Sequence, residues 1–507
     1  MNLARASGVL LHPTSLPGRF GIGDLGNEAF AFVDWLAGAG QSLWQVLPLG
    51  PTGYGDSPYQ CFSALAGNPL LISLERLAED GLLTAGELSD TPAFPAERVD
   101  YGPVIWFKWE RLTRAAERFR SHANGERQAE FETFCAHHAG WLDDFALFMA
   151  IKQHHGGAPW NTWSPELIAR DPGALAQWRE QMAGPVFLHK VVQFYFFRQW
   201  SAVKSYANSR GIQIIGDIPI YVAMDSADAW GNQHLFHFDS KGQPTVVAGV
   251  PPDYFSPTGQ LWGNPLYRWD KMAETGFAWW IQRFRMAYAQ ADILRVDHFR
   301  GFYNYWEVPA GETTAINGRW LLGPGAPLFR AVRDALGPVR IIAEDLGMFT
   351  LESRAGVDAL RAEFGFPGMK VLQFAFGGGL DDPFLPHNYT SPDWVAYTGT
   401  HDNDTTRGWW EATSTERERD SARRYLGCDG SDIAWDLIRL VWASVAQTAI
   451  APAQDLLNLG HEARMNTPSV SGPPNWCWRM LPGALSGDLA ARLRGLTEVY
   501  GRLPRGK

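Results

Sequence analysis

Three features that assign many proteins to a class are missing from this sequence: paired cysteines, long apolar runs and basic clusters. Its four cysteines (Cys61, Cys135, Cys428 and Cys477) lie far apart, and none belongs to a CxxC or CxxH pattern. This spacing excludes a disulfide framework and a zinc site, and it is typical of proteins in a reducing compartment.

No run of about 18 apolar residues occurs, so a membrane-spanning helix is not expected. Near the start, the short apolar run at residues 8–11 ends at His12 and Pro13, which makes it too short for the apolar region of a signal peptide. We therefore expect a soluble, cytoplasmic protein.

The charge balance also limits the possible partners. The formal net charge is −10, from 44 basic and 54 acidic residues, and no long basic run is present. Nucleic acids and anionic membranes bind surfaces rich in Lys and Arg, so neither is expected as the main partner.

Tryptophan is abundant, with 23 residues in a chain of 507. Several tryptophans lie in stretches rich in Gly, Pro and Asn that are typical of loops: Trp160, Trp163, Trp262, Trp409, Trp410, Trp476 and Trp478. Indole rings in loops offer a flat apolar face with a polar edge, which suits sugar rings as well as protein partners. The alternative for any single one is that it packs in the core.

Short apolar runs followed by turn residues recur along the chain and are typical of buried strands. There are eight of them, at residues 8–13, 43–48, 213–219, 293–297, 339–345, 369–374, 394–402 and 448–452. Helical patterns separate most of these runs, for example at residues 28–39 and 327–336. Alternating buried strands and helices predict a parallel sheet, and eight such units predict a (β/α)₈ TIM barrel.

The uneven spacing of the runs predicts large insertions on one catalytic barrel that spans residues 1–507. Residues 51–205 show mainly helical periodicity and are expected to form a mostly helical subdomain after the second strand. Residues 221–270 are rich in Gly, Pro, Asn and aromatics, and we expect ordered loops there that cover the cleft after the third strand. The C-terminal part has helical patterns at residues 432–446 and 487–500, and no C-terminal β-domain is expected.

Polar residues follow the predicted strands at the end where TIM barrels carry their active sites. They are His12, Asp217, Arg295, Asp297, His298, Glu344, Asp345, His401 and Asp402. A single carboxylate at such a position is often only a helix cap. Several carboxylates together with an arginine and histidines at one end favour a catalytic site.

Two chemistries use such a cluster. A metal-dependent hydrolase needs converging His and carboxylate ligands, but the HxH and HExxH spacings are missing. Glycoside chemistry needs one ionised carboxylate and one protonated carboxylic acid. Arg295 shares a strand face with Asp297 and favours its ionised form, whereas Glu344 follows the apolar residues 341–343, which favours its protonated form.

These residues belong to motifs that resemble those of the α-amylase clan, namely RVDH at 295–298, EDLG at 344–347 and HDN at 401–403. Further segments extend the resemblance from residue 8 to near the end: GVLLHPTSLP at 8–17, GDSPY at 55–59, GDIPIYV at 216–222, GVPPDYFS at 249–256 and QLWGNP at 260–265. Together they resemble the 4-α-glucanotransferases called amylomaltases or disproportionating enzymes, glycoside hydrolase family 77.

The resemblance implies a role for each matching residue. Asp297 would be the nucleophile, Glu344 the general acid/base, and Asp402 the third carboxylate, which binds sugar hydroxyls and helps to distort the ring. The residues implied in substrate binding are Tyr59, Asp217, Asp253, Trp262, Asn264, Arg295, His298 and His401. For Tyr59, Asp217 and His298 the alternative is that they only brace the strand ends.

The resemblance also implies that no metal or cofactor is needed, and the sequence contains no calcium loop of the D-x-[DN]-x-[DN]-G type. The expected activity is transfer of α-1,4-glucan segments between maltooligosaccharides, starch or glycogen fragments, through a covalent glycosyl-aspartate with retention of configuration. Two alternatives remain open, an α-glucan hydrolase with the same residues and a non-catalytic glucan-binding protein. We expect a monomer or a weak homodimer.

Overall fold

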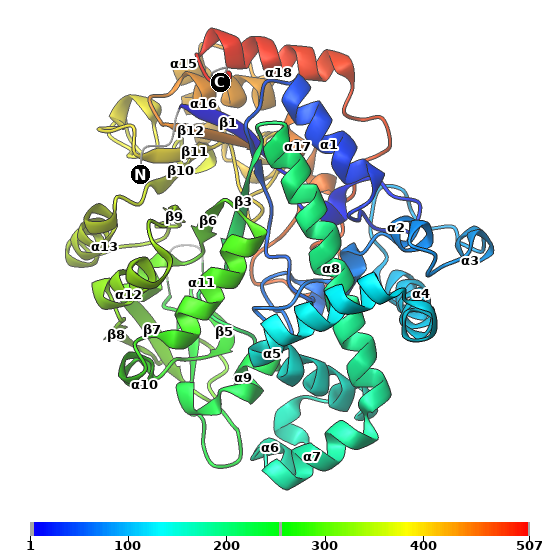
Figure 1. Cartoon of the computed structure of the whole chain (residues 1–507). Coiled ribbons are helices and arrows are strands. Elements are labelled where there is room, and N and C mark those ends of the chain that lie inside the picture. Colours follow the sequence, from blue (N-terminus) through cyan, green and yellow to red (C-terminus); the bar gives the residue numbers. More distant parts are fainter. Residues whose placement is uncertain (1–4, 253–255, 505–507) are drawn as a thin grey trace.

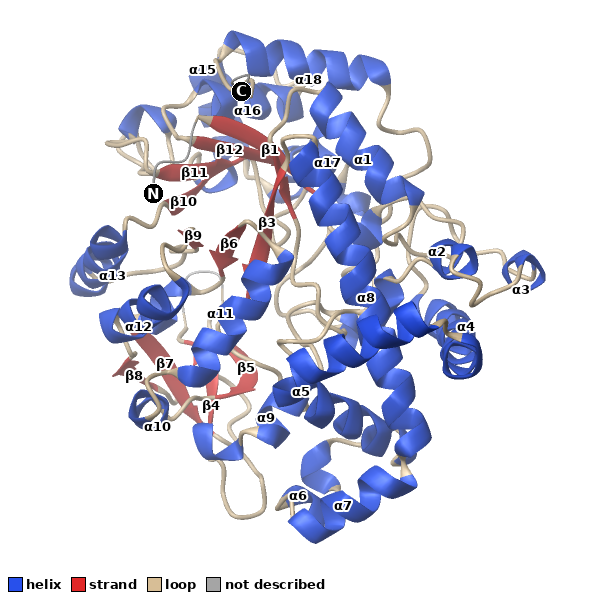
Figure 2. Cartoon of the chain, in the orientation of Figure 1, coloured by secondary structure: helices blue, strands red, loops and turns tan. Residues whose placement is uncertain are grey.

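The computed structural model describes residues 5–252 and 256–504, and its centre is a barrel of eight parallel strands (Figures 1 and 2). The strands are β1 (Ala6–Leu10), β2 (Leu43–Gln45), β3 (Gln213–Ile218), β6 (Ile293–Val296), β9 (Ile341–Ala343), β10 (Gly368–Val371), β11 (Trp394–Tyr397) and β12 (Thr448–Pro452). Each strand overlaps one of the eight apolar runs named in the sequence analysis. The predicted (β/α)₈ barrel is therefore confirmed.

The strands follow one another around the barrel in the order β10, β11, β12, β1, β2, β3, β6, β9. Between β9 and β10 the ring is joined at one point, where the Ala343 N–H donates a hydrogen bond of 2.9 Å to the Pro367 carbonyl. The register sets Asp217 opposite Arg295, and Val296 opposite Ala343. Residues that follow β3, β6 and β9 are thereby brought to one end of the barrel.

Helices cover the outside of the barrel. In α1 (Asn27–Gly38) the buried residues Ala29, Phe32, Val33 and Leu36 recur at a helical spacing and face the core. The other outer helices are α8 (Ala183–Ser209), α11 (Ala278–Gln290), α12 (Ala326–Leu336), α13 (Leu351–Phe364), α16 (Ile433–Ala443) and α18 (Gly487–Val499). Residues 372–393, all of them described, connect β10 to β11 with 3₁₀ turns and no α-helix.

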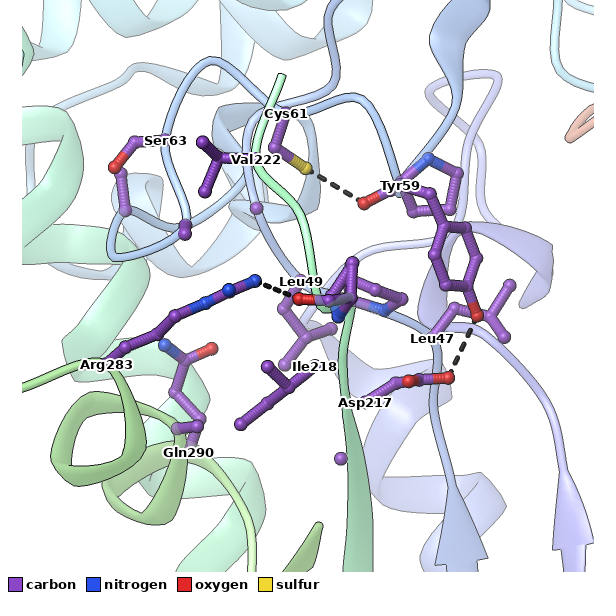
Figure 3. A pocket seen from close by; sticks show the side chains of 18 of the residues that line it. Leu47, Leu49, Tyr59, Cys61, Ser63, Asp217, Ile218, Val222, Arg283 and Gln290 are labelled. Carbon is purple, nitrogen blue, oxygen red and sulfur yellow. Dashed lines mark hydrogen bonds between the residues drawn. The ribbon is translucent and has the colours of Figure 1, made fainter. Parts of the chain in front are cut away.

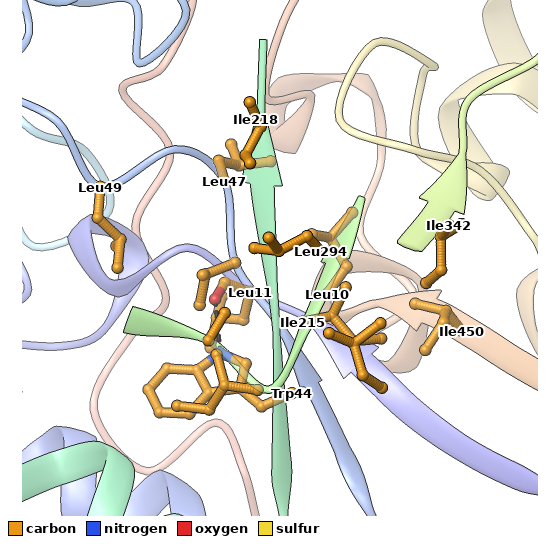
Figure 4. Packing of buried hydrophobic residues seen from close by; sticks show 14 of the residues in the cluster. Leu10, Leu11, Trp44, Leu47, Leu49, Ile215, Ile218, Leu294, Ile342 and Ile450 are labelled. Atoms are coloured by element: carbon orange, nitrogen blue, oxygen red, sulfur yellow. Dashed lines mark hydrogen bonds between the residues drawn. The ribbon is translucent and has the colours of Figure 1, made fainter. Parts of the chain in front are cut away.

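Apolar side chains from different strands form one buried core, both inside the barrel and between the barrel and its outer helices. Leu10, Trp44, Ile215, Leu294 and Ile342 come from five strands and pack in one cluster (Figure 4). All five are at most 5% exposed. This packing holds the strand ends, and the polar side chains that follow them, in fixed positions.

The segment between β2 and β3 is mostly helical and lies beside the barrel (Figure 1). Its helices before α8 are α2 (Leu74–Glu79), α3 (Ala85–Ser89), α4 (Tyr101–His122), α5 (Gly125–His154), α6 (Pro165–Ile168) and α7 (Pro172–Gln181). It has a separate apolar cluster, in which Phe148, Trp160 and Trp163 pack with Trp230. The long helix α8 contacts α5 and then leads the chain back to the barrel.

The expectation of loops for residues 221–270 needs a correction. This segment contributes β4 (Val246–Val250) and β5 (Gln260–Pro265) to a four-stranded antiparallel sheet with β7 (Asn304–Pro309) and β8 (Arg319–Leu322). The partner strands follow β6, about a barrel unit later in the chain. The pairing is thus non-local, and the Gly and Pro content of the segment conceals it.

Five further α-helices and one π-helical turn lie in the described chain, which also contains short 3₁₀ helices. The five α-helices are α9 (Ala227–Gly231), α10 (Trp269–Glu274), α14 (Thr406–Gly408), α15 (Glu416–Leu426) and α17 (Ala453–Leu456), and the π-helical turn is Trp409–Thr413. After β12 the described residues form helices, turns and loops, with a single bridge between Trp478 and Arg98. Within residues 5–252 and 256–504, no helix combines the length and apolar character that crossing a membrane requires.

Candidate active site

The centre of the site is Arg295 on β6, which joins two carboxylates. Its Nη1 lies 2.7 Å from Asp217 Oδ2, and its Nη2 lies 2.9 Å from Asp297 Oδ1. The side chains of Arg295 and Asp217 are 4% and 0% exposed, whereas that of Asp297 is 26% exposed. One guanidinium thus holds a buried carboxylate on one side and a carboxylate that reaches solvent on the other.

Tyr59 extends this network from the loop that follows β2. Its hydroxyl donates a hydrogen bond of 2.9 Å to Asp217 Oδ2, the same oxygen that Arg295 contacts (Figure 3). Its ring stacks on the ring of His401, with centroids 4.9 Å apart and planes inclined by 16°. Tyr59 therefore links the β3 end of the site to the β11 end.

Glu344 lies directly after β9, next to the strand that carries Asp297. Both of its carboxylate oxygens accept backbone hydrogen bonds, Oε2 from His298 N at 2.7 Å and Oε1 from Leu346 N at 3.0 Å. Burial, and after it the charge of Asp297, raise the pKa of Glu344 to about 7, while Arg295 opposes the rise. A carboxyl group with this pKa exchanges its proton near neutral pH.

His298 and Trp262 form the wall beside Glu344. Trp262, from β5 of the antiparallel sheet, packs with its ring at 87° to the ring of His298, with centroids 4.8 Å apart. Burial lowers the pKa of His298 to about 4, so its ring is neutral near neutral pH. Trp262 Nε1 donates to Gln260 Oε1 at 3.2 Å.

Asp402 follows β11 and is 46% exposed at its side chain. His401 is buried, and its Nε2 lies 3.4 Å from Asp402 Oδ1. Burial lowers the pKa of His401, and the charge of Asp402 opposes this. The imidazole of His401, whose neutral form burial favours, therefore lies beside the exposed carboxylate of Asp402.

Two residues that sequence reasoning missed hold Asp402 in place. Asn466 Nδ2 donates to Asp402 Oδ1 at 2.7 Å, and Arg464 Nη2 donates to the Asp402 carbonyl at 2.8 Å. Both lie in the loop after β12, outside every motif quoted above. Nothing in the spacing of this loop pointed to Asp402, because the contact depends on the return of the chain across the barrel end.

Asn264 and Asp253 differ from the other expected site residues. Asn264 is buried, with Nδ2 donating to the Val222 carbonyl at 2.8 Å and Oδ1 lying 3.5 Å from Gln60 Nε2. These contacts join the end of β5 to the loop after β3, and none reaches a carboxylate of the site. Asp253 lies outside the described residues, as do Tyr254 and Phe255.

Asp345 and His12 complete the strand-end residues, and Asp345 points away from the site. Arg361 and the Met369 N–H donate to its carboxylate, at 2.7 Å and 2.9 Å. It braces β9 against α13 and β10. His12 is buried beside His401, and burial lowers its pKa to about 3.

Most of the tryptophans in loop-like stretches pack in the core. Trp160, Trp163, Trp409, Trp476 and Trp478 are each at most 8% exposed. Trp476 also lies against the site, 5.8 Å from the Tyr59 ring and 5.9 Å from the His401 ring. For these residues the core alternative holds, whereas Trp262 and Trp410 are partly exposed.

A pocket extends behind Tyr59 and Asp217 (Figure 3). It is lined by residues of the loop after β2, of β3 and of α11, among them Cys61, Ile218 and Arg283. Arg283 donates to the Pro219 carbonyl, and to the Ile220 carbonyl at 2.9 Å, which fixes the chain just after Asp217. Burial raises the pKa of the Cys61 thiol to about 12, so it is not a nucleophile near neutral pH.

Over residues 5–252 and 256–504, no group of three or more His, Cys, Asp or Glu side chains is arranged to hold a metal ion. The carboxylates of the site instead accept hydrogen bonds from Arg295, Tyr59, Asn466 and backbone N–H groups.

Comparisons with known proteins agree on one family. The family model described as 4-alpha-glucanotransferase matches residues 11–484. The 4-alpha-glucanotransferases of Synechocystis sp. and Thermus thermophilus are 53% and 52% identical to the chain, over 98% and 99% of it and over 98% and 100% of their own lengths. The solved structure of amylomaltase from Streptococcus agalactiae in complex with acarbose is 41% identical, covers 99% of this chain and 100% of its own, and superposes with a TM-score of 0.94.

Replacing Arg295 by Met should destabilise the fold, because Asp217 would remain buried without its counter-charge. We expect the free energy of unfolding to fall by about 3 kcal/mol, as measured by urea denaturation. Burial already raises the pKa of Asp217 to about 7 with Arg295 in place, and without Arg295 it would lie higher still, so the loss should grow as pH rises above about 7. Arg439→Met, at an exposed position of α16, is the control. A loss that does not exceed that of the control would contradict the role assigned to Arg295.

Proposed function

This chain belongs to the 4-alpha-glucanotransferase family, glycoside hydrolase family 77, and we propose that it transfers α-1,4-glucan segments by a retaining double displacement. The observation that carries the proposal is the contrast between two adjacent carboxylates. Asp297 forms an ion pair with Arg295 at 2.9 Å, whereas the partly buried Glu344 accepts hydrogen bonds from backbone N–H groups and has a pKa raised to about 7. The setting of Asp297 suits a nucleophile, and that of Glu344 suits a general acid/base.

In the first step an oxygen of Asp297 attacks the anomeric carbon of a donor glucan. The bond from that carbon to the glycosidic oxygen breaks, and protonated Glu344 gives its proton to the departing oxygen. The departing chain leaves with a new 4-hydroxyl, and the donor segment remains as an ester on Asp297. The ion pair with Arg295 orients Asp297 for attack.

In the second step the 4-hydroxyl of an acceptor glucan or of glucose enters the place of the first product. Glu344, now ionised, takes the hydroxyl proton while the acceptor oxygen attacks the anomeric carbon and releases Asp297. Two inversions restore the α-configuration. Water in the same place would give hydrolysis, so the acceptor side of the site decides between transfer and hydrolysis.

The remaining residues would bind the sugar. Asp402, held by Asn466, has an exposed carboxylate suited to sugar hydroxyls, and His401 is positioned beside it. The Tyr59 ring offers a stacking surface, while Asp217 acts through Arg295 and Tyr59. Trp262 and His298 lie beside Glu344, and Asn264 anchors the end of the strand that carries Trp262. We also assign Asp253 to substrate binding, on sequence alone.

The segment at residues 221–270 is proposed to cover the cleft, as part of one catalytic barrel. Its strand β5 brings Trp262 against His298, within the site. A cytoplasmic location and a monomeric or weakly dimeric state are part of the same proposal, and so is a reaction without cofactor or metal. Size-exclusion chromatography with light scattering tests the oligomeric state.

A glucan hydrolase and a glucan-binding protein are the alternatives. The purified protein with maltotriose should form products longer than the substrate, together with shorter ones, and few net reducing ends. Asp297→Asn should lower the rate at least about 10³-fold, because the amide cannot form the ester. Its control is Asn161→Ala, on the exposed surface of the helical insertion. Shorter products alone would indicate a hydrolase, and an active Asp297→Asn variant would overturn the mechanism.

Replacing Trp262 by Ala should raise hydrolysis relative to transfer. Its ring lies against His298 beside the acid/base, where it limits the access of water and offers stacking surface to an acceptor. We expect the ratio of reducing ends released to chains redistributed to rise about 10-fold. Trp106→Ala, at an indole that is 68% exposed on α4, should leave the ratio unchanged. A ratio unchanged in Trp262→Ala would contradict this role.

The pH dependence should report Glu344. The first step needs its protonated form, and the pKa is raised from 4.5 to about 7, so kcat/KM should fall as pH rises through about 7. The rate with maltotriose, measured from about pH 4 to about pH 9, should show this alkaline midpoint. Circular dichroism over the same range checks that the fold is intact. A midpoint below about pH 5.5 would be inconsistent with an acid in this setting.

A further inference from the structure

The turn after Asp297 has a backbone conformation that is uncommon for its residue type. His298 has φ 48° and ψ 49°, in the left-handed region that favours glycine and that asparagine, aspartate and histidine adopt more often than other residues. A side chain with a Cβ is strained there, and such strain is retained where the surrounding structure requires it. The strain therefore raises the question of what this turn accomplishes.

The left-handed turn aims two consecutive N–H groups at one residue. His298 N donates to Glu344 Oε2 at 2.7 Å, and Phe299 N donates to the Glu344 carbonyl at 2.9 Å. Just before the turn, Asp297 N still donates to the Ile218 carbonyl of β3 at 2.9 Å. The chain thus leaves the nucleophile in strand geometry and reverses within one residue toward the acid/base.

We propose that His298 is a positioning residue for Glu344, and that it acts through its left-handed backbone and not through its imidazole ring. The N–H of His298 fixes Oε2, while Leu346 N fixes Oε1 at 3.0 Å. The carboxyl group is held in one orientation next to Asp297. The inference rests on the proposed function, because it assigns the orientation of the acid/base in that reaction.

Contacts of the residues around the turn limit its movement. The ring centroids of His298 and Trp262 lie 4.8 Å apart, and the Gly301 N–H donates to the His298 carbonyl at 2.9 Å. Glycine is required at position 301, because a Cβ there would lie 2.6 Å from Ile220 Cδ1 and 3.2 Å from His298 Cδ2. A histidine in this turn is thus locked by its neighbours in a conformation it would otherwise avoid.

The same N–H contact affects proton transfer. A donor to a carboxylate stabilises the ionised form and lowers its pKa. At Glu344 the N–H groups of His298 and Leu346 and the charge of Arg295 act in this direction, against burial and Asp297. If the turn at position 298 moves, Glu344 should keep its proton to higher pH and lose its orientation.

Three substitutions separate the backbone from the ring. Glycine and asparagine keep access to the left-handed region but remove the imidazole, whereas valine strongly disfavours that region. We expect His298→Gly and His298→Asn to show an alkaline midpoint of kcat/KM at or below that of the wild type, with any loss seen mainly in KM. We expect His298→Val to shift the midpoint upward by about one pH unit and to lower kcat about 10- to 100-fold.

Arg170→Val is the matched strain control. Arg170 also has a left-handed backbone, with φ 55°, but it lies in the helical insertion between α6 and α7. We expect this variant to melt at a lower temperature without any shift of the alkaline midpoint. A shift equal to that of His298→Val would show that general strain causes the effect, and would overturn the proposal.

The glycine variant keeps the test decisive even if His298→Val does not fold. An upward shift in His298→Gly would assign the effect to the ring and overturn the proposal, while an unshifted or lower midpoint supports the backbone role. Glu344→Gln identifies which idea has failed. If Glu344→Gln stays active with maltotriose, the proposed function fails. If it is inactive and His298→Gly moves the midpoint upward, only the positioning role fails.

Discussion

The guanidinium of Arg295 is the contact on which the rest of the site depends. It is almost completely buried at the end of β6, between Asp217 and Asp297. A buried cation of this kind costs several kcal/mol unless its partners are held in place. The barrel supplies those partners from two neighbouring strands, and the arginine in turn orients Asp297, the proposed nucleophile. The interaction is thus both part of the architecture and a condition of the proposed chemistry.

The carboxylates near Arg295 have different surroundings. The turn after Asp297 and the residues that follow Glu344 lie around its carboxyl group. Their backbone N–H groups donate to both of its oxygens. Asp402 is exposed and is held by a loop that returns from the C-terminal side of the barrel. Similar side chains can therefore act as nucleophile, acid/base and sugar ligand, because their environments differ.

The elements outside the barrel complete the site. Tyr59 comes from the loop after β2 and stacks on His401, and Trp262 comes from the antiparallel sheet and packs against His298. The helical insertion has its own apolar cluster and contacts the barrel through α8. Tyr59 and Trp262 thus place aromatic rings beside the strand ends that carry the site.

The sequence by itself determined the barrel and the position of the candidate residues at one end of it. Eight apolar runs separated by helical patterns predict the strands, and polar residues directly after them predict where Asp297, Glu344 and Asp402 meet, since both signals are local. Tertiary structure alone decided the pairing of β4 and β5 with β7, the burial of Trp160 and Trp163, the tether from Asn466 to Asp402 and the left-handed turn at His298. These depend on contacts between segments far apart in the chain, or on a backbone angle that the residue type disfavours. Local periodicity in the sequence indicates neither the long-range contacts nor the backbone angle.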